Sequence, residues 1–114
     1  MKMTDMIEGK VVILELSGKI MGGKEIDRFH DKIHEHLKAG RKLYVVDMKR
    51  VTFTNSSGLG MLIRGYASVT KADGKMVLAN ITNIQDLLAM TRLLTVFDTY
   101  DSREEAIAAL LGDD

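Results

Sequence analysis

One short segment, Asn55 to Gly60, carries the side chains with the clearest potential for chemistry. It reads NSSGLG, with adjacent hydroxyls and two glycines, and it lies where an apolar strand gives way to an amphipathic helix. The opening backbone N–H groups of a helix have no partner within the helix, and they carry partial positive charge. Small polar side chains at such a turn can cap the helix, hold an anion or carry a phosphate.

A second segment, Gly18 to Lys24, resembles a phosphate-binding loop because it reads GKIMGGK after an apolar strand. Asp47, at the end of LYVVD, imitates the acidic strand that accompanies such loops. A working loop places a magnesium-binding hydroxyl after its lysine, but here Glu25 follows Lys24 and would bring negative charge to the phosphates. We therefore expect an ordinary glycine-rich connection and no NTPase site.

The sequence also lacks residues that a metal site and a nucleophilic active site require. His30 and His34 lie one helical turn apart and His36 is close, but no cysteine or distant histidine completes a ligand set. Ser56 or Ser57 could sit on an exposed elbow, yet the pattern is not GxSxG and nothing positions a base beside either hydroxyl. We expect no metal, no cofactor and no catalytic residue, so the chain is not expected to be an enzyme.

Composition narrows the remaining classes of function. The chain has 114 residues, enough for one compact domain over residues 1–114. It has no cysteine, and its 16 basic and 16 acidic residues cancel. Balanced charge and few aromatic residues argue against nucleic acid as a partner. No apolar run approaches the length of a signal peptide or a membrane span, so we expect a cytoplasmic protein that binds no membrane.

The polar segment is expected inside a strand–helix–strand unit. Leu43 to Asp47, continued by Val51 and Phe53, forms the apolar strand before it. The helix starts near Ser57, and Met76 to Ala79 forms the next buried strand. Such units almost always pair their strands in parallel with a right-handed crossover.

The flanking elements complete an α/β fold. Residues 3–7 and 10–17 predict a hairpin, after which Gly18 loosens the chain, and Glu25 to Gly40 predicts a helix with one buried face. Toward the end we expect a short helix capped by Thr82 or Asn83, an edge strand at Val96 to Tyr100, and a final helix opened by Ser102 and Glu105. The predicted fold has a mixed sheet of about four or five strands, with helices packed mainly on one side.

With these elements in place, the chain resembles the STAS domain family, and within it the bacterial anti-sigma factor antagonists, or anti-anti-sigma factors. The resemblance covers nearly the whole length. It depends most on the stretch from Asp47 to Gly60, where an aspartate ends the central strand and a (D/N)(S/T)(S/T)GLG turn opens the next helix. Asn55 and Met21 depart from the family, since many antagonists have aspartate at both places, and both remove negative charge from the expected partner face.

The resemblance implies a regulatory switch protein that binds another protein. In its unmodified form such an antagonist binds an anti-sigma factor that is also a GHKL-type, ATP-dependent serine kinase, and this frees the sigma factor. The kinase phosphorylates the serine directly before the first glycine, here Ser57, which abolishes binding, and a PP2C-type phosphatase resets the switch. The alternative is a STAS scaffold subunit of a stress-signalling complex or of a transporter or lipid-trafficking system, without phosphorylation.

The expected docking surface combines two segments with the exposed side of the helix that follows the turn. Its residues are Asn55, Ser56, Gly58, Leu59 and Gly60 in the turn, with Met21, Gly22 and Gly23 in the preceding loop. The glycines are expected to leave the backbone bare for a partner. Asp47 is expected either to orient the turn by accepting backbone N–H bonds or to have a purely structural role. A phosphate on Ser57 would face the positive end of its helix, so folding should survive while docking fails.

Overall fold

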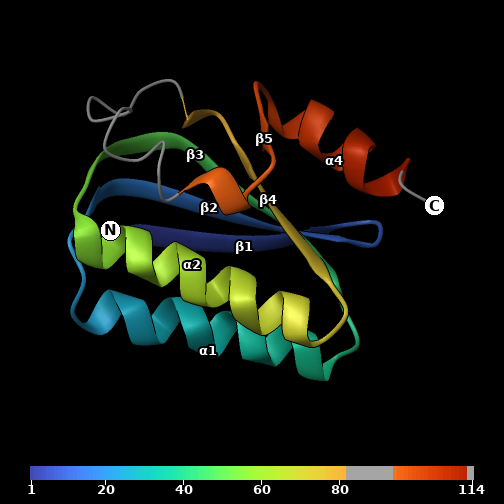
Figure 1. Ribbon diagram of the computed structural model, residues 1–114, viewed down its shortest axis with the longest axis horizontal. Coiled ribbons are helices and arrows are strands. Elements are labelled where there is room, and N and C mark those ends of the chain that lie inside the picture. Colours follow the sequence, from blue (N-terminus) through green and yellow to red (C-terminus); the bar gives the residue numbers. More distant parts are fainter. Residues whose placement is uncertain (82–93, 113–114) are drawn as a thin grey trace.

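A five-stranded mixed sheet organises the computed structural model, which describes residues 1–81 and 94–112 (Figure 1). The strands are β1 (Lys2–Glu8), β2 (Val11–Ile20), β3 (Leu43–Thr54), β4 (Lys75–Ala79) and β5 (Thr99–Tyr100). The helices are α1 (Lys24–Lys38), α2 (Ser56–Lys71), the 3-10 helix η2 (Leu94–Val96) and α4 (Arg103–Leu111). The strands follow chain order across the sheet, with β1 antiparallel to β2 and the others parallel. This confirms the predicted α/β class and mixed sheet.

The N-terminal hairpin forms as predicted, with Glu8 opposite Val11 across a two-residue turn. The second strand is longer than we expected. It continues through Gly18 to Ile20, and shifts in the register beside β3 absorb the irregular backbone there. Gly18 has φ +82, a backbone conformation that residues with a side chain rarely adopt. Because glycine adopts it readily, the strand continues through this position.

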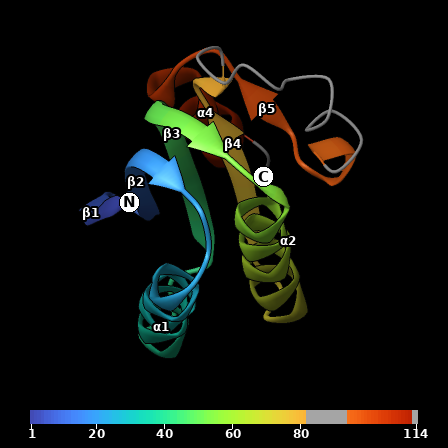
Figure 2. The same cartoon turned by 90° about the vertical axis from the view of Figure 1, so that its left-hand side faces the viewer.

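Two helices cover one face of the sheet, as the strand–helix–strand pattern predicts. Figure 2 shows α1 and α2 side by side beneath the strands. Phe29 and Ile33 of α1 and Leu62 and Val69 of α2 are buried in one core with the side chains of β2 and β3. Gly65 lets the two helices approach closely, because a Cβ atom there would lie 2.7 Å from the ring of Phe29.

The last helix, α4, covers the opposite face, so the helices are mainly but not all on one side. Ala106 and Leu110 pack on Val45 and Val77. The Ser102 hydroxyl caps α4 by accepting a hydrogen bond from the backbone N–H of Glu105 at 3.1 Å, as predicted. The predicted strand at Val96 to Tyr100 is shorter, since only Thr99–Tyr100 pairs, at the edge beside β4. The helix predicted after Thr82 or Asn83 lies outside the described residues.

The central strand β3 also runs further than predicted. Asp47 does not end it, because seven more residues continue the strand to Thr54. Only Leu43 to Asp47 pairs with β4, while pairing with β2 reaches Ile20 and Thr54. The two strands therefore extend past β4 as a ribbon and deliver the chain to the start of α2. No helix in the described ranges is long and apolar enough to cross a membrane.

Candidate protein-docking site

Asn55 caps α2 at the end of this ribbon. Its side-chain oxygen accepts a hydrogen bond from the backbone N–H of Gly58 at 2.9 Å, and its carbonyl accepts one from Leu59 at 3.0 Å. Its backbone is extended, with φ −115, as an N-cap requires. The first turn of α2 is thus stabilised by an amide, and neither serine hydroxyl is needed as the cap.

The same side chain ties the turn to the loop that follows β2. Its amide nitrogen donates a hydrogen bond to the carbonyl of Met21 at 3.0 Å, and its backbone N–H donates one to Ile20 at 3.3 Å. The two contacts fix the amide orientation, because Gly58 offers a donor and Met21 an acceptor. The structure therefore brings together two of the segments that we assigned to docking, the turn and the loop Met21 to Gly23.

Ser57 lies directly against this loop. A Cβ atom on Gly22 would lie 3.0 Å from the Cβ and 3.6 Å from the Oγ of Ser57, and Gly22 has φ +102. Glycine is required there both for the backbone conformation and for the close approach. Ser56 and Ser57 are both exposed, and neither hydroxyl makes a hydrogen bond to the described part of the chain.

Two predicted contact residues are inside the protein. Gly58 is buried, and a Cβ atom there would lie 2.2 Å from Thr54 Oγ1 and 2.8 Å from the carbonyl of Ile20. Leu59 is 5% exposed and belongs to the core. The expectation that Gly58 leaves backbone bare for a partner is therefore wrong, because this glycine serves internal packing. Gly60 is half-buried with open space around its Cα.

Apolar side chains are exposed beside the turn. Met21 is 52% exposed, and Phe53, which lies opposite Lys19 in the β2–β3 register, is 38% exposed. Gly23 is exposed as well. Sequence reasoning missed Phe53, because alternation along a regular strand would have placed it with Val51 in the core. The register shift between Gly18 and Lys19 breaks that alternation.

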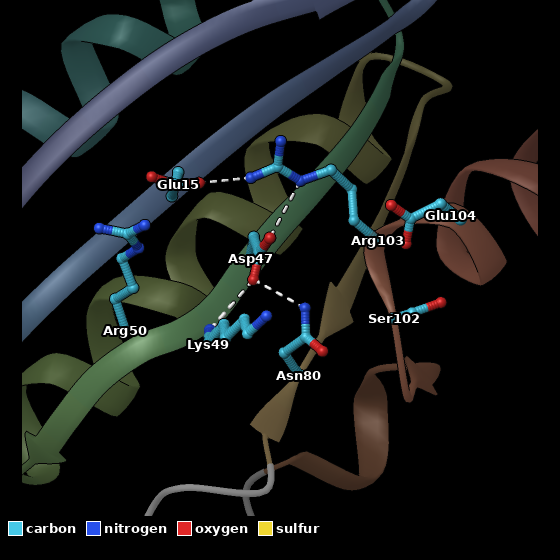
Figure 3. A pocket seen from close by; sticks show the side chains of 8 residues that line it. All are labelled: Glu15, Asp47, Lys49, Arg50, Asn80, Ser102, Arg103 and Glu104. Atoms are coloured by element: carbon cyan, nitrogen blue, oxygen red, sulfur yellow. Dashed lines mark hydrogen bonds and ion pairs between the residues drawn. The ribbon is translucent and has the colours of Figure 1, made fainter.

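Of the two roles expected for Asp47, the structure supports the purely structural one. It accepts hydrogen bonds from the backbone N–H of Lys49, from Asn80 Nδ2 and from Arg103 Nε, each at 3.0 Å, and none from the turn (Figure 3). Arg103 also forms an ion pair with Glu15. These side chains line a polar cavity of about 270 Å³ between the sheet and the start of α4. Asp47 therefore fastens α4 to the sheet and does not orient the Ser57 turn.

We call the ion pair of Asp47 with Arg103 the Asp47–Arg103 latch. Each of its two residues stabilises the charged form of the other. Burial raises the pKa of Asp47, but hydrogen bonds from Asn80, Lys49 and Arg103 outweigh it and hold the pKa below its ordinary value. Burial lowers the pKa of Arg103, but its bonds to Asp47 and Glu15 outweigh burial and hold the pKa above its ordinary value, so the guanidinium stays charged. A buried aspartate in an apolar strand signals that a cation must be near. The sequence does not say which cation, since Arg103 lies 56 residues away.

The three histidines lie in different surroundings. His30 Nε2 lies 3.2 Å from the carbonyl of Met61, which joins α1 to α2, and burial lowers its pKa. His36 is buried with Nε2 2.8 Å from Asp5, while His34 is exposed. Within residues 1–81 and 94–112 no group of three histidine, cysteine or acidic side chains could hold a metal ion. The GKIMGGK segment is divided between the end of β2, a short loop and the start of α1.

The described residues form a small α/β module with a mixed sheet and a paired helix layer. Asn55 caps its hydroxyl-bearing turn beside the loop that carries the exposed Met21. The family model of the STAS domain matches residues 3–106, so the chain belongs to the STAS domain family.

The chain is also similar to individual proteins. The chain is 23% identical over 111 residues to "Putative anti-sigma factor antagonist BtrV" of Bordetella bronchiseptica, covering 96% of this chain and 94% of that protein. A "putative anti-sigma factor antagonist" from Thermotoga maritima has a TM-score of 0.80 at 20% identity, covering 96% of this chain and 94% of the other.

Three further solved structures share the fold. The anti-sigma factor antagonist SpoIIAA in its unphosphorylated form has a TM-score of 0.76 at 19% identity, covering 97% of this chain and 99% of the other. SpoIIAA of Bacillus in its phosphorylated form has a TM-score of 0.69 at 20% identity, covering 95% and 98%. A sulfate transporter family protein from Wolinella succinogenes has a TM-score of 0.76 at 18% identity, covering 96% and 93%. At these identities the structural likeness shows the fold alone.

Proposed function

We propose that this chain is an anti-sigma factor antagonist that works as a phosphoswitch through Ser57. The observation that carries the proposal is the state of the Ser57 hydroxyl. It is exposed at the start of α2, it bonds to no described residue, and Asn55 does the capping in its place. A kinase can therefore reach this hydroxyl without breaking a contact that the fold needs.

The fold is expected to tolerate a phosphate at this position. The first turn of α2 holds no acidic residue, so the new group meets no like charge within the helix. A phosphoserine carries about −1.5 to −2 charges near neutral pH. Negative charge at a helix N-terminus is favourable by about 0.3–1 kcal/mol, so the modified helix should stay formed.

Docking, in contrast, is expected to fail after phosphorylation. The backbone of Gly22 lies against Ser57, so a phosphate would add bulk and charge at the junction between the turn and the exposed Met21. A hundredfold loss of affinity corresponds to about 2.7 kcal/mol. One dianion placed in a partly buried contact without a partner can supply a penalty of that size.

In this proposal the partner is an anti-sigma factor that is itself a GHKL-type, ATP-dependent serine kinase. Binding of the unmodified chain frees the sigma factor, and a PP2C-type phosphatase restores the unmodified form. The chain itself has no catalytic role and no cofactor, and it acts in the cytoplasm with these partners. The similarity to BtrV and SpoIIAA supports this role, and the two forms of SpoIIAA support modification within this fold.

Substitutions at Ser57 test the proposal directly. Ser57→Asp and Ser57→Glu should weaken binding to the anti-sigma factor by at least about tenfold, while the melting temperature changes by no more than about 2 °C. Ser57→Ala should keep binding and block phosphate uptake from ATP. Ser56→Ala is the matched control and should still be phosphorylated. Equal affinity of all forms, or phosphate uptake by Ser57→Ala, would reject the switch.

A second candidate is a permanent STAS subunit of a signalling scaffold or of a transporter or lipid-trafficking system. The similarity to the Wolinella transporter family protein favours it. Here the same turn and loop dock without modification. Native mass spectrometry of the purified chain would then show a stable assembly, and its amount would not change when Ser57 is replaced by alanine.

A further inference from the structure

We propose that the end of the molecule around Ser57 is a basic and apolar platform whose partner presents an acidic surface. This inference rests on the proposed function and specifies the chemistry of its partner. We define the platform as residues 17–24 and 48–57. These two segments contain four cations, Lys19, Lys24, Lys49 and Arg50, and no acidic residue, although the whole chain has no formal net charge.

The sheet register brings the two segments of the platform together. Lys19 lies opposite Phe53 and Ile20 opposite Thr54, so β2 and β3 end side by side. The hydrogen bond from Asn55 to Met21 then holds the loop on the turn. Lys19, Lys24 and Arg50 are exposed, so their charge is available to a partner.

Apolar contact area lies among these cations. Five large hydrophobic residues are exposed within the described residues, and two of them, Met21 and Phe53, belong to the platform. Asn55 contributes a neutral amide and no carboxylate. Because complementary charge at an interface rim directs partner choice, an apolar centre with a basic rim fits a partner whose own rim is acidic.

An acidic segment lies at the start of α4. Between Asp98 and Glu105 the chain carries four acidic residues and one arginine, and that arginine is bound to Asp47 and Glu15. In Figure 1 the start of α2 and helix α4 lie on opposite sides of the view. Glu104 lines the same cavity as Lys49 and Arg50, so Lys19 and Lys24 are the platform cations outside that cavity.

The positive charge of the platform explains why phosphorylation would weaken binding and not strengthen it. A phosphate of about −1.5 to −2 charges on Ser57 cancels roughly half of the platform's formal charge. Encounter with an acidic partner becomes slower, and the close contact then opposes two negative groups. On an acidic docking surface, an added phosphate would not cancel the charge that attracts the partner.

The experiment measures the association rate constant of the unmodified chain with the GHKL-type anti-sigma factor kinase encoded nearest to its gene. Raising the ionic strength from about 0.01 M to about 0.15 M shortens the Debye length from about 30 Å to about 8 Å, and the rate constant should fall at least about tenfold. Lys19→Glu and Lys24→Glu should each lower it about three- to tenfold at low salt.

Matched controls lie at the other end of the strands. Lys10→Glu and Lys42→Glu make the same charge change at exposed sites before β2 and β3, and they should leave the rate constant within about twofold. If the complex forms at the same rate in all variants and at both salt concentrations, the platform is overturned while the proposed function stands. If the unmodified chain does not bind the kinase at all, both are overturned.

Discussion

The side-chain amide of Asn55 donates a hydrogen bond to the carbonyl of Met21 at 3.0 Å while its oxygen caps α2. These are the two positions at which the chain departs from the aspartates of the antagonists that it resembles. An aspartate at residue 55 could accept the bond from Gly58 but would have no donor for the Met21 carbonyl. The amide thus couples the turn to the loop that carries Met21, and because the acceptor is a backbone carbonyl, this coupling does not depend on the side chain of residue 21.

This coupling predicts different results for two substitutions of Asn55. Asn55→Ala removes both bonds and should lower the free energy of unfolding by about 2 kcal/mol. Asn55→Asp keeps the cap, and the helix dipole offsets part of the lost bond, so the decrease should be about 0.5 kcal/mol. Both should speed amide exchange at Gly22 and Gly23 at least about fivefold. Urea unfolding and hydrogen exchange measure these effects. Unchanged exchange in both variants would show that the amide does not hold the loop.

The two glycines of the turn should respond in opposite ways to alanine. Gly58→Ala places a Cβ atom 2.2 Å from Thr54 Oγ1 and should destabilise the protein by about 1–3 kcal/mol. Gly60→Ala meets nothing within 4 Å and should stabilise α2 by about 0.5–1 kcal/mol, since alanine is the better helix former. Urea denaturation of the two variants checks the contrast. A similar effect of both would mean that the turn repacks freely.

The Asp47–Arg103 latch predicts loss of stability in acid. The folded pKa of Asp47 lies below its ordinary value of 3.8, so the unfolded chain takes up this proton first as the pH falls. The stabilisation is present above about pH 4 and is lost as the pH falls through the folded pKa. Arg103→Met leaves the buried carboxylate without its cation and should cost about 2–4 kcal/mol at neutral pH.

Unfolding in urea at several pH values between about 7 and about 3 tests the latch. Asp47→Asn should flatten the acid decline, and the exposed Glu104→Gln should reproduce the parent curve. An acid decline that is as steep in Asp47→Asn as in the parent would assign the effect to other carboxyl groups.

His30 predicts a second pH effect at milder acidity. Burial lowers its pKa from the ordinary 6.5, so the folded protein favours the neutral ring that contacts Met61. Below about pH 6.5 the unfolded chain binds a proton first, and stability should fall until the folded pKa is reached. His30→Gln should remove this part of the pH dependence, measured as the difference in unfolding free energy between about pH 7.5 and about pH 5.5. Identical slopes for parent and variant would contradict it.

Local sequence patterns were enough to predict the elements around the turn. Short apolar runs predicted the strands of the hairpin and β3, and apolar residues three and four apart predicted α1 and α2, because each pattern is confined to one element. The cap at Ser102 followed from a motif of four residues, so it could also be predicted. Element lengths were less certain. Register shifts in the β2–β3 pair let both strands continue past the point where alternation is lost.

The sequence by itself determined the order of the elements, the family resemblance and the place of Ser57 at a helix start. All of these depend on residues that are neighbours along the chain. Only the tertiary structure decided that Asp47 binds Arg103, that Gly58 is buried against Ile20, and that Met21 receives a bond from Asn55. These contacts join residues from different strands and helices, and the sheet register and helix docking that bring them together are set by packing of the whole domain.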